Sequence, residues 1–164
     1  MNLPELVARL DQLGIEPTKG LPDDLFYFVS RTTPLVNVDL LIKNEKDQNL
    51  LAWRDDRYAG SGWHLPGGII RFKETFEERV IQVGLAELGT RVTFDHRPLA
   101  LNQIISNHHV TRGHFISILY RCFVPVDYQL ERSELDQKNA GDLMWCDGCP
   151  DNLLKPQEIY REFL

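Results

Sequence analysis

The sequence lacks the long apolar runs of membrane proteins and the leader of exported ones. No stretch of the 164 residues approaches the roughly 20 consecutive apolar residues that cross a bilayer as a helix. The N-terminus does not show the basic and then apolar order of a signal peptide. We therefore expect a cytoplasmic protein that does not bind membranes.

Cysteine is scarce, with only Cys122, Cys146 and Cys149 in the chain. The count is odd, and no second pair accompanies Cys146 and Cys149 to complete a zinc site. A redox role would require that pair to begin a helix in a thioredoxin-like setting. We interpret all three as reduced structural thiols.

Positive charge is in deficit, because 18 Lys and Arg residues face 24 Asp and Glu residues, for a net charge of −6. This balance gives no general attraction for nucleic acid, and no stripe of Lys and Arg alternates with aromatic residues. A phosphate-bearing ligand would have to be held by a local cluster or by a metal ion. The charge balance therefore favours a small-molecule partner and disfavours nucleic acid.

What is present fits one globular core with a short extension. Hydrophobic residues make up 43% of the chain and charged residues 26%, which is ordinary for a single domain of this length. We divide the chain into a helical N-terminal extension over residues 1–30 and a main domain over residues 31–164.

The extension is predicted to hold two helices. Pro4 suits a first helical turn and Gly14 a stop, and Asp23 and Asp24 precede a second short helix over residues 25–29. The sequence leaves open whether the apolar stripe of the first helix packs on its own domain or forms a homodimer interface. That stripe consists of Leu3, Leu6, Val7, Leu10 and Leu13.

Apolar and alternating runs predict β-strands in the main domain. Residues 35–42 are apolar almost throughout, as in a strand covered on both faces, and residues 48–53 are expected to pair with them as a hairpin. Residues 98–106 and 114–126 read as long strands, of which the second alternates. A last short strand is expected around Trp145.

The segment from Trp63 to Gly89 organises the rest of the chain and reads as strand, glycine turn, strand, loop and helix. Pro66 cannot extend a central strand, and the glycine pair that follows lets the backbone pass tightly. Thr75 and Glu78 form a capping box, so a helix is expected to begin there and to end before Gly89.

Glu87 lies near the end of this helix, within roughly 20° of Phe76 at about 100° per residue. Apolar residues fall on both sides of the helix, so we expect it to be packed on both sides. A carboxylate among apolar neighbours needs a partner. An arginine, a row of backbone N–H groups and a divalent metal ion are the three alternatives.

Gly68, Glu74, Glu87 and Gly89 match the fixed skeleton of the Nudix box, which this segment resembles in register throughout. The usual Arg-Glu-x-x-Glu-Glu of the box reads Gln-Val-Gly-Leu-Ala-Glu over residues 82–87. The GDP-mannose mannosyl hydrolases resemble this variant, with an apolar residue for the first Glu and then Ala-Glu-Leu-Gly. The resemblance extends over nearly everything after residue 20.

The resemblance implies an α/β fold, the Nudix α/β/α sandwich. Its mixed sheet would lie between the box helix and a C-terminal helix over residues 156–164. It also implies Mg²⁺, with Mn²⁺ as a substitute. The metal ligands would be Glu87, the carbonyl of Gly67 and Asn139, because asparagine can offer a carbonyl oxygen to such an ion.

Two charged residues of the predicted strands are candidates for catalysis and substrate binding. Asp39 matches the acidic position that lines the sugar pocket in the mannosyl hydrolases, and a salt bridge to Arg54 or Arg57 is the competing interpretation. Arg54 matches the arginine that helps to neutralise the departing diphosphate, for which a planar guanidinium is suited.

Three histidines lie in or beside the loop between the two long strands. His108 and His109 are adjacent, so they would face opposite ways on a strand and make a poor chelating pair. One of them is nevertheless a candidate to reach the substrate as a catalytic group. His114 opens a strand and is a candidate for substrate binding, with a plain polar role at a strand end as the alternative.

The expected general base of the mannosyl hydrolases is absent. Their loop carries a histidine where this chain has Ala140, which cannot take a proton from water. Lys138 would be mostly protonated and is a poor substitute. His108, His109 or Asp142 would have to supply the base.

The favoured function is Mg²⁺-dependent hydrolysis of a nucleoside diphosphate sugar of the GDP-mannose or GDP-glucose type, which releases sugar and nucleoside diphosphate. Val83 and Ala86 stand where carboxylates usually sit, so the helix can hardly assemble the metal cluster that activates water for attack at phosphorus. The alternatives are ordinary cleavage of the P–O–P bridge and a degenerate domain that binds a nucleotide sugar without turnover.

Overall fold

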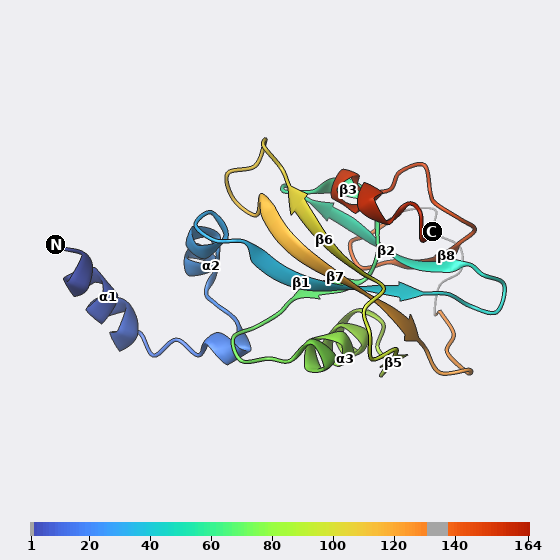
Figure 1. Ribbon diagram of the computed structural model, residues 1–164, viewed down its shortest axis with the longest axis horizontal. Helices are drawn as coiled ribbons and strands as arrows, with labels where there is room; N and C mark the ends of the chain where they lie inside the picture. The colour runs from blue at the N-terminus through green and yellow to red at the C-terminus, as the bar shows by residue number, and fades with distance from the viewer. Residues whose placement is uncertain (1, 131–137) are drawn as a thin grey trace.

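The computed structural model describes residues 2–130 and 138–164 (Figure 1). Its strands form two sheets, one with the order β4-β1-β7-β5 in which β6 also pairs with β7, and one with the order β3-β2-β8. The strands are β1 (Leu35–Ile42), β2 (Asn49–Asp56), β3 (Gly60–His64), β4 (Gly67–Ile69), β5 (Thr93–Phe94), β6 (Ala100–Ile105), β7 (His114–Phe123) and β8 (Leu143–Cys146).

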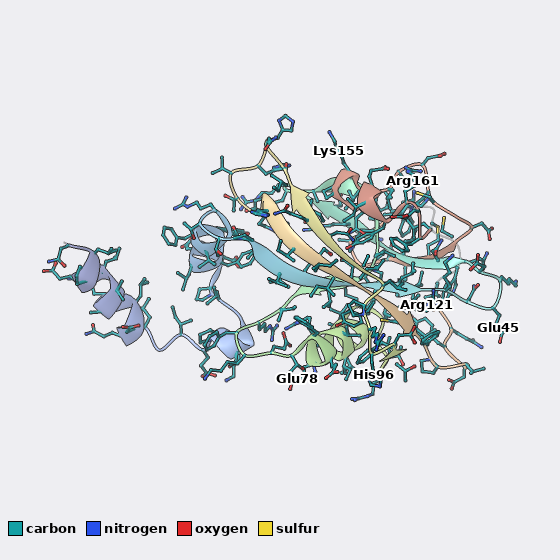
Figure 2. The ribbon with its side chains drawn as sticks, in the orientation of Figure 1. Glu45, Glu78, His96, Arg121, Lys155 and Arg161 are labelled. Carbon is teal, nitrogen blue, oxygen red and sulfur yellow. The ribbon has the colours of Figure 1, made fainter. Side chains whose placement is uncertain are left out.

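The larger sheet is mixed, because β1 and β7 run parallel while its other pairs are antiparallel. Alternate residues of β1 enter two different cores: Leu40 packs with Val80 of the box helix, whereas Leu41 packs with Trp63 and Tyr160. Figure 2 shows Glu78 of the helix on one side of the sheet and the C-terminal Lys155 and Arg161 on the other. The predicted Nudix sandwich with a mixed sheet is confirmed.

The predicted hairpin between residues 35–42 and 48–53 is wrong in its pairing. β1 belongs to the larger sheet and β2 to the smaller one, and between them only Lys43 bridges Asn49. Leu50 and Leu51 are both fully buried, each in a different core. The turn therefore passes the chain from one sheet to the other, which buries both faces of β2.

The box helix is α3 (Phe76–Glu87), and its capping box is confirmed, since the side chains of Thr75 and Glu78 each accept the other's backbone N–H. Gly89 ends it with φ 68°. The prediction that both sides of α3 are packed is wrong, because only one side faces the sheet. Phe76 is 48% exposed and Leu85 45%. The buried helix residues are Arg79, Val80, Val83 and Gly84.

The two predicted N-terminal helices are α1 (Leu3–Gln12) and α2 (Asp23–Ser30), joined through a 3₁₀ turn, η1 (Pro17–Lys19). No residue of α1 is buried, and Figure 1 shows α1 standing apart from the sheets. Its apolar stripe therefore does not pack on its own domain. The homodimer alternative stays a prediction.

The C-terminal segment is a 3₁₀ helix, η2 (Lys155–Tyr160), where an α-helix over residues 156–164 was predicted. Pro156 lacks an N–H and sits in its first turn. Tyr160 is fully buried. Among the residues described here, no helix is long and apolar enough to cross a membrane.

Candidate functional site

The glycine pair after Pro66 lets two neighbours approach the backbone closely. β4 pairs with β1 so that Gly67 lies opposite Asp39. A Cβ on Gly67 would stand 2.3 Å from Asp39 Oδ1 and 2.8 Å from the Val38 carbonyl oxygen. A Cβ on Gly68 would stand 2.8 Å from Val83 of α3. Both glycines are therefore needed to bring α3 and Asp39 to the two faces of β4.

The strand register also determines the direction in which the N–H and C=O groups of Gly67 point. Leu40 donates to the Pro66 carbonyl at 2.8 Å and Ile70 donates to the Val36 carbonyl at 2.9 Å. In an antiparallel ladder with this phase, Gly67 is a non-hydrogen-bonded position opposite Asp39, so its N–H and C=O point away from β1. β4 is an edge strand of this path. Both groups thus face the open edge, where Glu87 lies.

Glu87 lies beside the backbone N–H of Gly67, which favours its carboxylate form. The pKa of Glu87 is raised to about 7, mainly by burial and also by the nearby charge of Asp39, while the Gly67 backbone and Arg54 oppose this shift. No Lys, Arg or His among the described residues forms an ion pair with Glu87. Of the three predicted partners, a backbone N–H is present and an arginine pair is not.

The Glu87 carboxylate has lone pairs left over that could bind a cation. Within residues 2–130 and 138–164, no group of three or more His, Cys, Asp or Glu side chains could hold a metal ion. One carboxylate and the edge-facing carbonyl of Gly67 therefore match the sparse ligand set predicted from the sequence. The rest of a coordination shell would have to come from substrate oxygens or water.

Glu74, the other acidic residue of the box skeleton, has a structural role. Its carboxylate pairs with Arg79 at 2.7 Å and 2.8 Å and also accepts the Arg71 N–H at 2.9 Å. Arg79 is only 8% exposed and lies under Gly68. A buried guanidinium requires such a partner, so this pair holds the start of α3 against β4.

Asp39 is buried within a network of neutral donors. Its Oδ2 accepts hydrogen bonds from Tyr160 at 2.7 Å and Asn37 at 2.9 Å, and from the Ser117 hydroxyl. Arg54 pairs with Asp56, so the predicted salt bridge from Asp39 to Arg54 or Arg57 is not formed. Burial raises the pKa of Asp39, and these hydrogen bonds only oppose that shift.

A row of small polar residues crosses the sheet beside Asp39. Asn37 of β1 and Asn102 of β6 both lie in register with Ser117 of β7. The Asn37 Oδ1 and the Asn102 Nδ2 are buried and have no hydrogen-bond partner among the described residues. Unsatisfied amide atoms at such positions are costly, and a hydroxyl-rich ligand could satisfy them.

Arg54 lies at the centre of the site. Its Nε donates to Asp56 Oδ2 at 2.5 Å, and Asp56 Oδ1 also accepts the backbone N–H groups of Tyr58 and Ala59 at 2.8 Å each. The charge of Arg54 acts on Glu87, on His64 and on Arg112. Arg54 therefore links the acidic groups to the loops around them.

His64 is a neutral imidazole beside Arg54. The pKa of His64 is lowered to about 4, mainly by burial and also by the charge of Arg54, while the Leu65 backbone and Asp56 oppose this shift. Its Nδ1 lies 2.7 Å from the Leu65 carbonyl oxygen. Because a carbonyl can only accept, Nδ1 carries the proton and Nε2 keeps its lone pair.

The predicted histidines do not gather around Glu87. His108 and His109 are exposed in the β6–β7 loop. The Nε2 of His114 lies 2.9 Å from Nε2 of Gln103 on the neighbouring strand, in line with a polar role at a strand end. Their assignment to catalysis or substrate binding stays a prediction.

Asn139 and Ala140 lie in a turn against β2. The Asn139 N–H donates to Asp142 Oδ2 at 2.6 Å, and the Trp53 N–H donates to the Asp142 carbonyl at 2.7 Å. Lys138 places its ammonium 4.6 Å from the centre of the Trp53 ring. The structure records no contact of Asn139 with Glu87, so its place in the metal shell stays a prediction.

Sequence reasoning missed Arg112, which belongs to the loop in which only the histidines were singled out. It has φ 57°, and its guanidinium lies 5.8 Å from the Phe26 ring and 5.4 Å from the Tyr58 ring. No local pattern marks it, because its partners come from α2 and the β2–β3 turn. The deep polar group around Tyr160 was equally hidden, since it joins segments 121 residues apart.

The structure also has a hollow of about 360 Å³, which lies away from these residues. None of the predicted site residues lines it. The lining residues are Leu41, Lys43, Asp47, Arg121, Cys122, Phe123 and Phe163. The chemistry of Glu87, Gly67 and Arg54 therefore defines the candidate site better than this hollow does.

No family model matches the chain. The sequence is 37% identical over 82 residues to the low-salt glycan biosynthesis protein Agl8 of Haloferax volcanii, a match that covers 50% of this chain and 52% of that relative. The chain thus spans about half the length of the curated relative it matches.

Solved structures show the same architecture over a larger share of the chain. The MutT Nudix hydrolase of Burkholderia pseudomallei is 22% identical with a TM-score of 0.59, and the match covers 79% of this chain and 97% of that one. A UDP-X diphosphatase is 19% identical with a TM-score of 0.57, over 97% of this chain and 73% of that one. The chain therefore has the fold of the Nudix hydrolases.

Proposed function

We propose that the chain is a Nudix hydrolase that acts on a nucleoside diphosphate sugar of the GDP-mannose or GDP-glucose type and releases the sugar and the nucleoside diphosphate. The observation that carries this proposal is the lone carboxylate of Glu87 at the edge-facing Gly67. The similarity to a relative named for glycan biosynthesis agrees with a sugar-bearing substrate.

Nudix hydrolases generally use a divalent metal ion, and the residues present fit one. Glu87 and the carbonyl of Gly67 would hold Mg²⁺ or Mn²⁺, with Asn139 as a third predicted ligand. When bound, the metal would supply positive charge that stabilises a departing diphosphate. Arg54 would bind the same diphosphate through its guanidinium.

The box helix supports displacement at the sugar carbon better than attack at phosphorus. Val83 is 3% exposed and packs under Gly68, and Ala86 carries no oxygen, so neither can replace a metal-binding carboxylate. A single site can still favour departure of the diphosphate from the sugar. Asp39 and the unsatisfied amides of Asn37 and Asn102 would then meet the sugar hydroxyls.

The proposal predicts slow turnover, because Ala140 replaces the histidine of the mannosyl hydrolases. A positioned general base contributes about 10² to 10⁴ in rate. We expect Ala140→His to raise sugar release from GDP-mannose by about 10²-fold, with ¹⁸O from labelled water appearing in the sugar. Ala140→Gln is the matched control, and we expect no comparable gain from it.

The products decide between the proposal and its first alternative. Ordinary cleavage of the P–O–P bridge is favoured by the likeness to a UDP-X diphosphatase and would release sugar phosphate and nucleoside monophosphate. Incubation of the parent with GDP-mannose, GDP-glucose and UDP-glucose in Mg²⁺, with each product quantified, separates the two. Label recovered in phosphate would contradict our proposal.

A second alternative is a domain that binds a nucleotide sugar without turnover. The loss of the box arginine, of two box carboxylates and of the loop histidine favours it. Micromolar binding by the parent with no product from parent or from Ala140→His would support this alternative. A measurable rate in either protein would count against it.

A further inference from the structure

We propose that Arg112 is a second guanidinium, beside Arg54, that binds the diphosphate of the ligand, and that aromatic rings of α2 and the β2–β3 turn hold it in place. This inference rests on the proposed function, because it takes the ligand to be a nucleoside diphosphate sugar. Arg112 would be a substrate-binding residue.

Two separate segments, α2 and the β2–β3 turn, position Arg112. Its backbone N–H donates to Ser30 Oγ of α2 at 3.3 Å. Its guanidinium lies 5.8 Å from the centre of the Phe26 ring, also on α2, and 5.4 Å from that of Tyr58 in the β2–β3 turn. Its φ of 57° is uncommon for a residue with a side chain. The two rings thus fix the position of a long, flexible side chain, and the backbone of Arg112 is strained in this conformation.

The surroundings of Arg112 leave positive charge in excess. The titratable groups that face it are Arg54, Asp56, Tyr27 and Tyr58. Asp56 is the single carboxylate among them, and it already accepts hydrogen bonds from Arg54, Tyr58 and Ala59. Among the described residues, Arg112 forms no ion pair. Two guanidinium groups held near one engaged carboxylate form a binding place for a multivalent anion.

The order of the charges indicates which anion fits. Arg54 acts electrostatically on both Glu87 and Arg112, whereas Glu87 is not among the groups that face Arg112. Arg54 therefore lies near both the proposed metal position and Arg112. Its partner Asp56 accepts the N–H of Tyr58, whose ring contacts Arg112. A diphosphate carries its phosphoryl groups in series, so one can meet Arg54 while the other meets Arg112. A monophosphate would reach only one of them well.

A purely structural role is the competing explanation, and Arg57 supplies the control for it. Arg57 lies 4.7 Å from the Tyr58 ring and 5.8 Å from the Tyr27 ring, so it joins the same aromatic residues. It differs in being exposed and in not facing Arg54. If arginines on these rings only attach α2, Arg57 and Arg112 should behave alike in ligand binding.

The test is calorimetry with inorganic pyrophosphate, GDP and GMP in Mg²⁺, on the parent, Arg112→Gln, Arg112→Lys and Arg57→Gln. Gln keeps an aliphatic stem over the rings, and thermal melting confirms that each variant is folded. We expect Arg112→Gln to weaken pyrophosphate and GDP binding by about 10- to 100-fold and GMP binding much less. Arg112→Lys should recover part of the loss, and Arg57→Gln should stay within about threefold of the parent.

The outcomes separate this inference from the proposed function. Equal pyrophosphate affinity in the parent and a folded Arg112→Gln would overturn the inference, as would equal losses in the Arg112 and Arg57 variants or a parent that binds neither pyrophosphate nor GDP. Sugar release from GDP-mannose is scored separately. Arg112-dependent pyrophosphate binding without sugar release would uphold the inference while the proposed function fails.

Discussion

The two halves of the candidate site carry opposite charge and are held in different ways. Asp39 and Glu87 are carboxylates surrounded by neutral donors, and burial raises the pKa of both. Arg54 and Arg112 are cations that share one engaged carboxylate, that of Asp56. Among the described residues, neither Asp39 nor Glu87 forms an ion pair, and Arg112 forms none either.

The opposite charges of the two halves indicate which kind of ligand would bind both. A complex of a divalent cation with a diphosphate would lower the electrostatic energy of both halves. The cation would bind the acidic half, and the phosphates would bind the basic half. Pairing the halves with each other directly would leave no binding capacity. Substitutions that alter one half at a time can therefore separate the two contributions.

Removing the charge of Glu87 should break the acidic half. We expect Glu87→Gln to lower metal-dependent turnover or ligand binding by more than about 100-fold while the fold is kept, because a neutral amide attracts Mg²⁺ weakly. Isothermal titration with Mg²⁺ and GDP, beside thermal melting, measures both. An unfolded variant, together with a parent that shows no metal response, would make Glu87 a structural residue instead.

Removing Arg54 should weaken the basic half. We expect Arg54→Ala to lower GDP affinity by about 10- to 100-fold and to leave binding of the free sugar unchanged, since its guanidinium would meet phosphate oxygens. Lysine should rescue only partly. Calorimetry that finds equal GDP affinity in parent and variant would remove Arg54 from the site.

Adding a methyl group at Gly67 should push β4 away from Asp39 and so disturb the acidic half. The new Cβ would stand 2.3 Å from Asp39 Oδ1 and 2.8 Å from a backbone oxygen, so the backbone must shift. We expect Gly67→Ala to destabilise the protein by about 1–3 kcal/mol in urea unfolding. Gly60→Ala is a control at a site with no neighbour within 4 Å, although its φ of 79° adds local strain.

In the absence of metal, the raised pKa of Glu87 should make the free energy of unfolding depend on pH. The pKa of Glu87 is raised from its usual 4.5 to about 7 on folding, so the folded state binds more protons between these values. Stability should therefore fall as pH rises from about 4.5 to 7, by on the order of 1–2 kcal/mol after solvent screening. Glu87→Gln should lack this component. Parallel pH profiles for the two proteins would contradict the assignment.

Local patterns predicted the scaffold of the site well, because they depend on neighbours along the chain. The capping box at Thr75 and Glu78 and the end of α3 at Gly89 were found where the sequence placed them. The predicted turn at the glycine pair is wrong, because Gly67 and Gly68 lie within β4 and pair with β1. The partition of β1 and β2 between two sheets was not predictable in this way, because it depends on which core has room for Leu50 and which for Leu51.

Helix caps and strand patterns predicted the elements of the scaffold from the sequence, because they are short-range features. The resemblance to the Nudix box singled out Glu87, Gly67 and Arg54. Only the tertiary structure decided what surrounds them. It brought Tyr160 to Asp39 and Arg112 to Phe26 and Tyr58. Burial, the raised pKa of Glu87 and the pairing of charges arise from residues distant in the chain, and their positions follow from how the sheets and loops pack.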